Sequence, residues 1–202
     1  MSETSYRRLA AVLLALWFVF ALSASALHLF VGDPNLPPIA LGLSATIPVI
    51  AFVIWFASSA GWRNFVLGLN PRTLVYVQSL RILGYVFLVL LSVGLLPGFM
   101  ALPAGWGDIA IGVTAPLVAT QLTNPARRSG FIAWQLLGMA DLVTAVTLGA
   151  TARFIDPQST QTGIMAVLPM SLIPTFLVPV FFILHIICIA QALRWKTEQA
   201  FA

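Results

Sequence analysis

The sequence predicts an all-α integral membrane protein, a bundle of six transmembrane helices with both termini in the cytoplasm, and three observations support this fold class. Hydrophobic residues make up 60% of the 202 residues and charged residues only 8%, with a mean hydropathy of +0.99. Soluble domains carry about a quarter charged residues, so this chain has too few to cover a water-facing surface. The apolar residues fall into six long runs, and nearly all of the basic residues outside those runs fall on one predicted side of the membrane.

Six segments are long enough to cross a hydrocarbon core of about 30 Å, which requires about 20 mostly apolar residues. These segments are residues 9–30, 37–58, 73–96, 103–122, 131–150 and 165–193. The connections between them are rich in Gly, Pro, Asn and Asp, which favour turns. We therefore expect residues 1–202 to form a single multi-pass transmembrane domain.

The first three spans are justified by their flanking residues. The first follows Arg7 and Arg8 and runs to Phe30 without a small-residue cleavage site, so it is predicted to be a retained span and not a signal peptide. The second follows the turn signal at residues 32–35. The third follows a polar connection that ends in Asn70-Pro71, which predicts a helix start.

The last three spans contain or follow prolines. The fourth is expected to begin at Pro103, because proline is favoured at the first position of a helix. The fifth follows Asn124-Pro125. The sixth contains three prolines, each of which removes a helical hydrogen bond and frees a carbonyl, so we expect a kinked or discontinuous helix. These prolines are Pro169, Pro174 and Pro179.

The basic residues predict the orientation. With the amino terminus in the cytoplasm, eight of the ten Lys and Arg residues fall on the inner side and only Arg153 on the outer side. The eight are Arg7, Arg8, Arg63, Arg72, Arg127, Arg128, Arg194 and Lys196. This sorting indicates a bacterial cytoplasmic (inner) membrane and an even number of crossings. Because these residues form no basic stripe, nucleic acid is excluded as a partner.

Three charged residues lie inside the predicted spans, where each costs about 2.5 to 3.5 kcal/mol at the bilayer centre. Counted from the inner ends of their spans, Arg81 lies about 12 Å deep, Asp141 about 15 Å and His185 about 12 Å. This shared depth predicts that Arg81 faces the bundle interior and pairs with Asp141, with His185 and Tyr85 completing the network. The remaining charged residue, Asp108, is predicted close to the outer end of the fourth span.

Further polar residues extend this predicted substrate- or proton-binding site. Gln78 and Gln135 lie nearer the cytoplasm than the pair, and Thr144 lies on the outer side of Asp141. His28 and Trp106 are expected beside Asp108, as the outer entrance to a polar path.

Each of these residues also has a purely structural interpretation. Arg81 and Asp141 could form a static salt bridge that fixes helix register, or Arg81 could extend its side chain toward the inner surface. Asp108 could be placed by the positive end of a helix dipole. His185 taken alone is more often a buried structural histidine than a functional one.

No cofactor and no metal site is predicted. The two histidines, His28 and His185, are separated by about 15 to 20 Å along the membrane normal, too far to ligate one haem within one chain. Single-ligand or intersubunit haem or pigment binding stays open as an alternative. At the level of Asp141 the chain offers one imidazole and one carboxylate beside an Arg that would oppose a cation.

These observations lead to three interpretations of function. The first is a small-solute or proton-coupled transporter or binding protein whose buried polar site contains Asp141. The second is a non-catalytic subunit of a larger membrane complex, which binds lipid, pigment or partner helices. The third, an intramembrane lipid-modifying enzyme, is less favoured because nucleophile and dinucleotide motifs are absent. The expected partners are membrane lipids and either partner membrane subunits or further copies of the chain.

Overall fold

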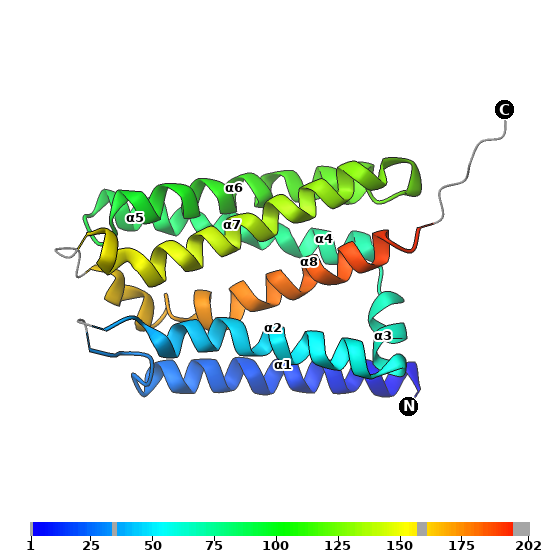
Figure 1. Cartoon of the computed structure of the whole chain (residues 1–202), viewed down its shortest axis with the longest axis horizontal. Coiled ribbons are helices and arrows are strands. Elements are labelled where there is room, and N and C mark those ends of the chain that lie inside the picture. Colours follow the sequence, from blue (N-terminus) through cyan, green and yellow to red (C-terminus); the bar gives the residue numbers. More distant parts are fainter. Residues whose placement is uncertain (1, 34–35, 157–160, 196–202) are drawn as a thin grey trace.

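The computed structural model describes residues 2–33, 36–156 and 161–195, and these ranges contain helices and no strands (Figure 1). In chain order the elements, with 3₁₀ and π helices labelled η, are α1 (Glu3–Ala26), α2 (Ile39–Ser58), α3 (Ala60–Leu67), α4 (Pro71–Val77), η1 (Gln78–Gly84), α5 (Tyr85–Ser92), α6 (Gly98–Gln121), η2 (Pro125–Arg127), α7 (Arg128–Ile155), η3 (Gln161–Ala166), η4 (Ile173–Leu177) and α8 (Val178–Ala192). Lys196 and parts of two predicted turns, residues 34–35 and 157, lie outside the described residues.

Six of these helices or helix runs are long and apolar enough to cross a membrane, as predicted. The third is a composite in which α4, η1 and α5 follow one another without a break from Pro71 to Ser92. The polar connection before it, predicted as a loop, contains the short helix α3. Ser59 caps α3 by accepting a hydrogen bond from the Trp62 amide, and the Trp62 ring stacks on Trp55 with centroids 4.0 Å apart. This stacking holds α3 against the end of α2.

Several predicted span boundaries are wrong. The helix α1 spans Glu3–Ala26 and α7 spans Arg128–Ile155, where spans 9–30 and 131–150 were predicted. The fourth membrane-length helix, α6, begins at Gly98, and Pro103 lies inside it. Apolar backbone in a membrane is more stable in a helix than in an open loop, because lipid cannot satisfy its hydrogen-bonding groups. The sixth begins at Ile173, not at residue 165, because residues before it form η3 and turns. From Ile173 to Ala192 the π turn η4 and α8 follow one another as one helix run, so Pro174 and Pro179 lie inside the helix and Pro169 precedes it.

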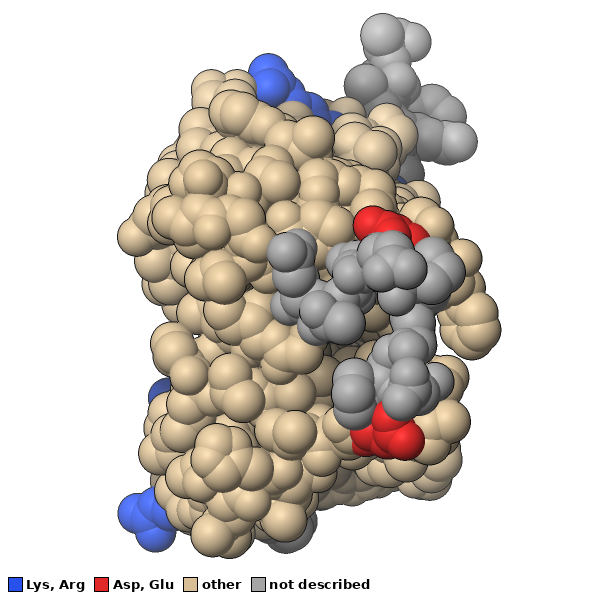
Figure 2. All heavy atoms as spheres, turned by 90° about the vertical axis from the view of Figure 1, so that its left-hand side faces the viewer, with Lys and Arg blue, Asp and Glu red and all other residues tan. Residues whose placement is uncertain are grey.

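The helices form a bundle (Figure 1), and its two ends differ in charge. We call the end where α1 starts and α8 finishes the basic end, because seven of the described basic residues lie on elements there. These are Arg7, Arg8, Arg63, Arg72, Arg127, Arg128 and Arg194. At the opposite end, Asp33 and Asp156 follow α1 and α7, and Figure 2 shows two acidic patches on this face. The predicted separation of charge between the ends is thus present in the folded chain.

The interior is layered along the bundle axis. One buried apolar cluster, near the basic end, includes Val75, Ile111 and Phe131. A second, nearer the opposite end, includes Phe87 and Ala104. Because α4 to α5, α6 and α7 contribute to or pack against both clusters, the residues between them on these elements lie at the centre of the bundle. That central layer contains the charged side chains described below.

A tryptophan from α1 satisfies a carbonyl that a proline leaves free in the sixth span. Pro179 has no amide hydrogen to donate to the carbonyl of Thr175, four residues earlier. The indole Nε1 of Trp17 donates to this carbonyl at 3.1 Å, so the freed acceptor is satisfied by a side chain from another helix. The Trp17 ring also packs edge-on against Phe176. These contacts attach α1 to η4.

Replacing Trp17 by Phe is expected to lower the free energy of unfolding by about 1 kcal/mol, the net value of a typical hydrogen bond, while most of the aromatic packing remains. The measurement is denaturation by SDS of the protein in mixed micelles. Trp106→Phe is the matched control, because Trp106 is 60% exposed and is expected to be neutral. Equal stabilities of the two variants would contradict a structural role for the Trp17 indole.

Candidate functional site: a buried ion cluster

Arg81 lies on η1, and the geometry of this 3₁₀ segment determines which residues face the interior. A 3₁₀ helix has three residues per turn, so side chains three apart project in the same direction. Gln78, Arg81 and Gly84 are spaced in this way and are the buried residues of η1. Tyr85, four residues after Arg81, is turned away and is 54% exposed. The prediction that Tyr85 completes the network is therefore wrong, because it assumed α-helical spacing.

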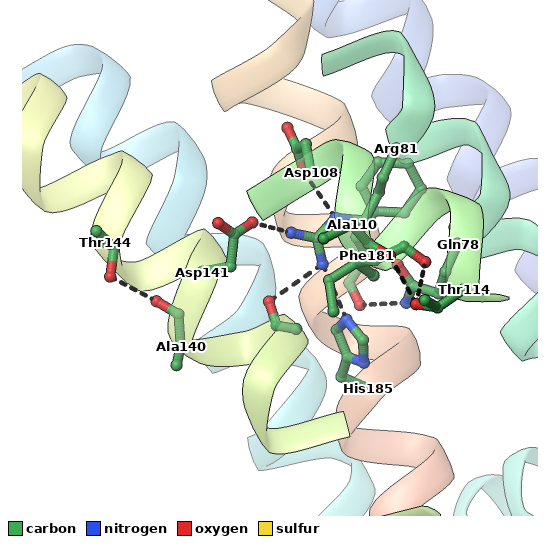
Figure 3. A network of polar contacts seen from close by, with 12 residues as sticks. Gln78, Arg81, Asp108, Ala110, Thr114, Ala140, Asp141, Thr144, Phe181 and His185 are labelled. Carbon is green, nitrogen blue, oxygen red and sulfur yellow. Dashed lines mark hydrogen bonds and ion pairs between the residues drawn. The ribbon is translucent and has the colours of Figure 1, made fainter. Parts of the chain in front are cut away.

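The Arg81 side chain is fully buried and uses its guanidinium to join three other helices (Figure 3). Its Nε donates to Asp108 Oδ1 on α6 at 2.7 Å, and its Nη2 donates to Asp141 Oδ2 on α7. Its Nη1 donates to the carbonyl of Gly138 at 3.1 Å and contacts His185 Nε2 on α8 at 3.2 Å. We call Arg81, Asp108, Asp141 and His185 the ion cluster. The expected pairing of Arg81 with Asp141 is present.

Asp108 belongs to this cluster, so its predicted place at the outer entrance is wrong. The prediction counted from a helix start at Pro103, but α6 begins at Gly98, ten residues before Asp108. At 1.5 Å per residue this places Asp108 about 15 Å from the helix start, near the middle of α6. Neither of its expected neighbours lies with it. His28 is exposed after the end of α1, and Trp106 is exposed on the outside of α6.

The hydrogen bonds of His185 indicate its tautomer. Arg81 has donors and no acceptor, so His185 Nε2 must accept from it and carries no proton. The other ring nitrogen, Nδ1, contacts Gln135 Oε1 and therefore donates to it. Gln135 and His185 are both fully buried. Gln135 thus orients a neutral imidazole toward the guanidinium.

Replacing Gln135 by Met is expected to lower the free energy of unfolding by about 1 to 3 kcal/mol, because the buried Nδ1–H of His185 loses its acceptor. The measurement is denaturation by SDS, together with the ¹⁵N chemical shifts of the His185 ring, which should report Nδ1–H in the unmodified protein. Gln121→Met, at an exposed position, is the control. An Nε2–H tautomer in the unmodified protein would contradict the assignment.

Glycines allow the helices to approach closely enough for these contacts. A Cβ at Gly107 would overlap the Asp141 carboxylate, one at Gly84 would overlap Asp108, and one at Gly138 would overlap the His185 ring. The predicted site includes none of these three glycines. The available signal was their spacing, since Gly107 adjoins Asp108 and the other two lie three residues from a cluster charge.

Two remaining predicted residues occupy different positions relative to the cluster. Gln78 is buried beside it and donates through Nε2 to the carbonyl of Phe181 at 3.1 Å. Its Oε1, like Gln135 Nε2, is buried without a hydrogen-bond partner among the described residues. Thr144 is exposed, and its hydroxyl donates to the carbonyl of Ala140 on its own helix. Gln78 and Gln135 therefore extend the polar interior, whereas Thr144 does not.

The cluster has an unbalanced charge in a nearly closed environment. One guanidinium faces two carboxylates, whose side chains are 15% exposed in Asp108 and 14% exposed in Asp141. The guanidinium takes the central position, so the carboxylates and the imidazole bind Arg81 and do not converge on a common point. Within the described ranges no group of three His, Cys, Asp or Glu side chains is placed to hold a metal ion.

Comparison with known proteins gives one similarity. A family model described as Domain of unknown function (DUF8737) matches residues 36–193, a range that contains five of the six membrane-length helices and every residue of the ion cluster. No curated protein and no solved structure matched the chain.

Proposed function

The chain belongs to the family described as Domain of unknown function (DUF8737), and from its ion cluster we propose that it is a multi-pass membrane protein that transports a small solute together with a proton. In this proposal Asp108 and Asp141 share the proton, and Arg81 holds them in place. The charge imbalance of the cluster is the observation that carries the proposal.

Two carboxylates and one guanidinium leave one negative charge when both acids are ionised. An uncompensated charge is costly in an environment of low dielectric constant. Uptake of one proton makes the cluster neutral and removes this cost. A static salt bridge would need only one acid, so the second carboxylate is what favours a proton-binding function over a purely structural one.

Irregular helical segments flank the cluster and support movement around it. Arg81 lies on the 3₁₀ segment η1, and the π-helical turn η4 directly precedes the helix that contains His185. Mid-helix 3₁₀ segments and π turns are frequent at functional hinges. Apolar clusters separate the ion cluster from each end of the bundle, so alternating access would require one of them to open at a time.

The charge at the ends of the bundle supports an orientation in the membrane. The basic end carries seven of the described basic residues, and Lys and Arg concentrate on the cytoplasmic side of membrane proteins. We therefore place the basic end in the cytoplasm and the opposite end outside, in a bacterial cytoplasmic membrane. Six crossings then place both termini inside.

The test is the transport current of the full chain in proteoliposomes adsorbed to a solid-supported membrane and exposed to pools of small solutes at fixed pH. A solute that evokes proton-coupled current in the unmodified protein is expected to evoke none in Asp141→Asn. Thr144→Val is the matched control, because Thr144 lies on the same helix with its hydroxyl outside the ion cluster, and it should retain the current. A solute current that persists in Asp141→Asn would contradict the proposal.

A further inference from the structure

We propose that a cavity of about 320 Å³ near the end opposite the basic end binds an uncharged lipophilic molecule, and that this molecule is the solute moved by the proton-coupled function above. The claim that this molecule is a transported solute rests on that proposed function. The binding itself rests on the cavity.

The cavity lies between α2, α7 and the start of the sixth span. Leu41 and Gly42 line it from α2, Ala145 and Gly149 from α7, and Pro174 from η4. Phe87 of α5 and Met100 of α6 line it as well. Sites between the helices of a bundle are common places for small ligands, and this volume is at the small end of their range.

The chemistry of the lining selects an apolar ligand. Aliphatic, aromatic and thioether side chains dominate it, and the charged residue among the described lining residues is Asp33. With no basic residue among these lining residues, the surface offers no compensation for a desolvated anion, and its apolar side chains favour an uncharged ligand. An engineered apolar cavity of about 150 Å³ binds benzene. About twice that volume accommodates a fused two-ring hydrocarbon or a short stretch of acyl chain.

Gly42 shows that the space beside α2 is open. This residue is half-buried and lines the cavity, and a Cβ built on it meets no atom within 4 Å. A larger side chain at Gly42 would therefore occupy the cavity without displacing a neighbour.

The cavity is connected to the ion cluster through shared elements. Ala145, which lines the cavity, lies one helical turn beyond Asp141 on α7. Val178, which also lines it, lies two turns before His185 on α8. The π turn η4 forms part of the wall and directly precedes α8. A ligand in the cavity therefore contacts two of the elements that carry the ion cluster. Coupling between ligand binding and proton binding requires such shared elements.

The experiment measures saturable binding of tritiated naphthalene to the full chain in lipid nanodiscs, with empty nanodiscs as the reference for partition into lipid. The unmodified protein is expected to show a saturable component, and Gly42→Phe should lose it because the ring fills the cavity. Ile50→Phe is the matched control, since Ile50 lies on the same helix, is 57% exposed and lines no part of the cavity. If Gly42→Phe does not fold, Ala145→Leu fills the same space from α7.

Native mass spectrometry of the detergent-purified protein distinguishes two possible occupants of the cavity, a free lipophilic molecule and the acyl chain of a membrane lipid. A phospholipid retained by the unmodified protein and by Ile50→Phe but lost from Gly42→Phe would identify an acyl chain as the occupant. Absence of both saturable naphthalene binding and retained lipid in the unmodified protein would overturn the inference.

The variant Asp141→Asn distinguishes failure of the proposed lipophile site from failure of the proposed transport function. Asp141→Asn should bind naphthalene as the unmodified protein does, because the cavity does not include the carboxylate. Naphthalene binding without any Asp141-dependent current would refute proton coupling and leave the lipophile site standing. An Asp141-dependent current with no ligand in the cavity would refute only the lipophile site.

Discussion

Replacing Arg81 by Met is expected to lower the free energy of unfolding by about 3 to 5 kcal/mol, the loss typical when one partner of a buried ion pair is removed. Met fills much of the same volume but leaves Asp108 and Asp141 facing each other without a cation. It also removes the donor to the carbonyl of Gly138 and to His185 Nε2. The measurement is denaturation by SDS of the protein in mixed micelles.

Arg72→Met provides the control, because Arg72 is an exposed arginine at the start of the same membrane-length helix and surface substitutions are usually within about 0.5 kcal/mol. Adding Asp108→Asn and Asp141→Asn to Arg81→Met should recover part of the stability, since no carboxylate then remains unpaired. If this triple variant is no more stable than Arg81→Met alone, the loss comes from packing and not from charge.

The contact between Arg81 and Asp141 could be predicted from the sequence because a charge in an apolar span has few ways to be stabilised. Depth counted along two helices was sufficient to match a cation with an anion. The same argument placed His185 beside them. Its Nε2 lies 3.2 Å from Arg81 Nη1, and Figure 3 shows the ring pointing toward the guanidinium. The depth of a residue along its helix, however, does not specify which other residues face the ion cluster.

The position of Asp108 and the exposure of Tyr85 could not be predicted, and both errors have a local cause. Pro103 looked like a helix start, but the cost of a proline inside the helix is outweighed here, because the apolar residues before it are more stable in a helix than in an open loop. Tyr85 was placed with a period of 3.6 residues, whereas η1 turns with a period of three. In both cases the local geometry of one segment changed which face a residue occupies.

The glycines near the ion cluster explain why these segments lie so close together. Gly112 of α6 faces the backbone of η1, and a Cβ there would overlap the amide nitrogen of Ile82 and lie 3.0 Å from the carbonyl carbon of Arg81. Both contacts are with main-chain atoms, which cannot move to another rotamer. A glycine at this position is therefore required for α6 to approach the segment that carries Arg81.

Gly112→Ala is accordingly expected to lower the free energy of unfolding by about 3 kcal/mol, at the upper end of the usual cost of overpacking. Helix propensity alone would act in the opposite direction, because Ala is favoured over Gly in a helix by about 1 kcal/mol. The measured loss thus contains a larger steric cost. Since α6 must move away from η1, the 2.7 Å contact of Arg81 Nε with Asp108 should lengthen, and solute-driven current should fall with it.

Gly42→Ala separates the two effects, because the same substitution on α2 places a Cβ where no atom lies within 4 Å. Only the change in helix propensity acts there, so Gly42→Ala should be neutral or slightly stabilising in the same SDS denaturation assay. Equal stabilities of Gly112→Ala and Gly42→Ala would mean that α6 and η1 are not held in contact by their backbones. In that case the ion cluster would depend on charge alone, and Arg81→Met should separate the two segments as well as destabilise them.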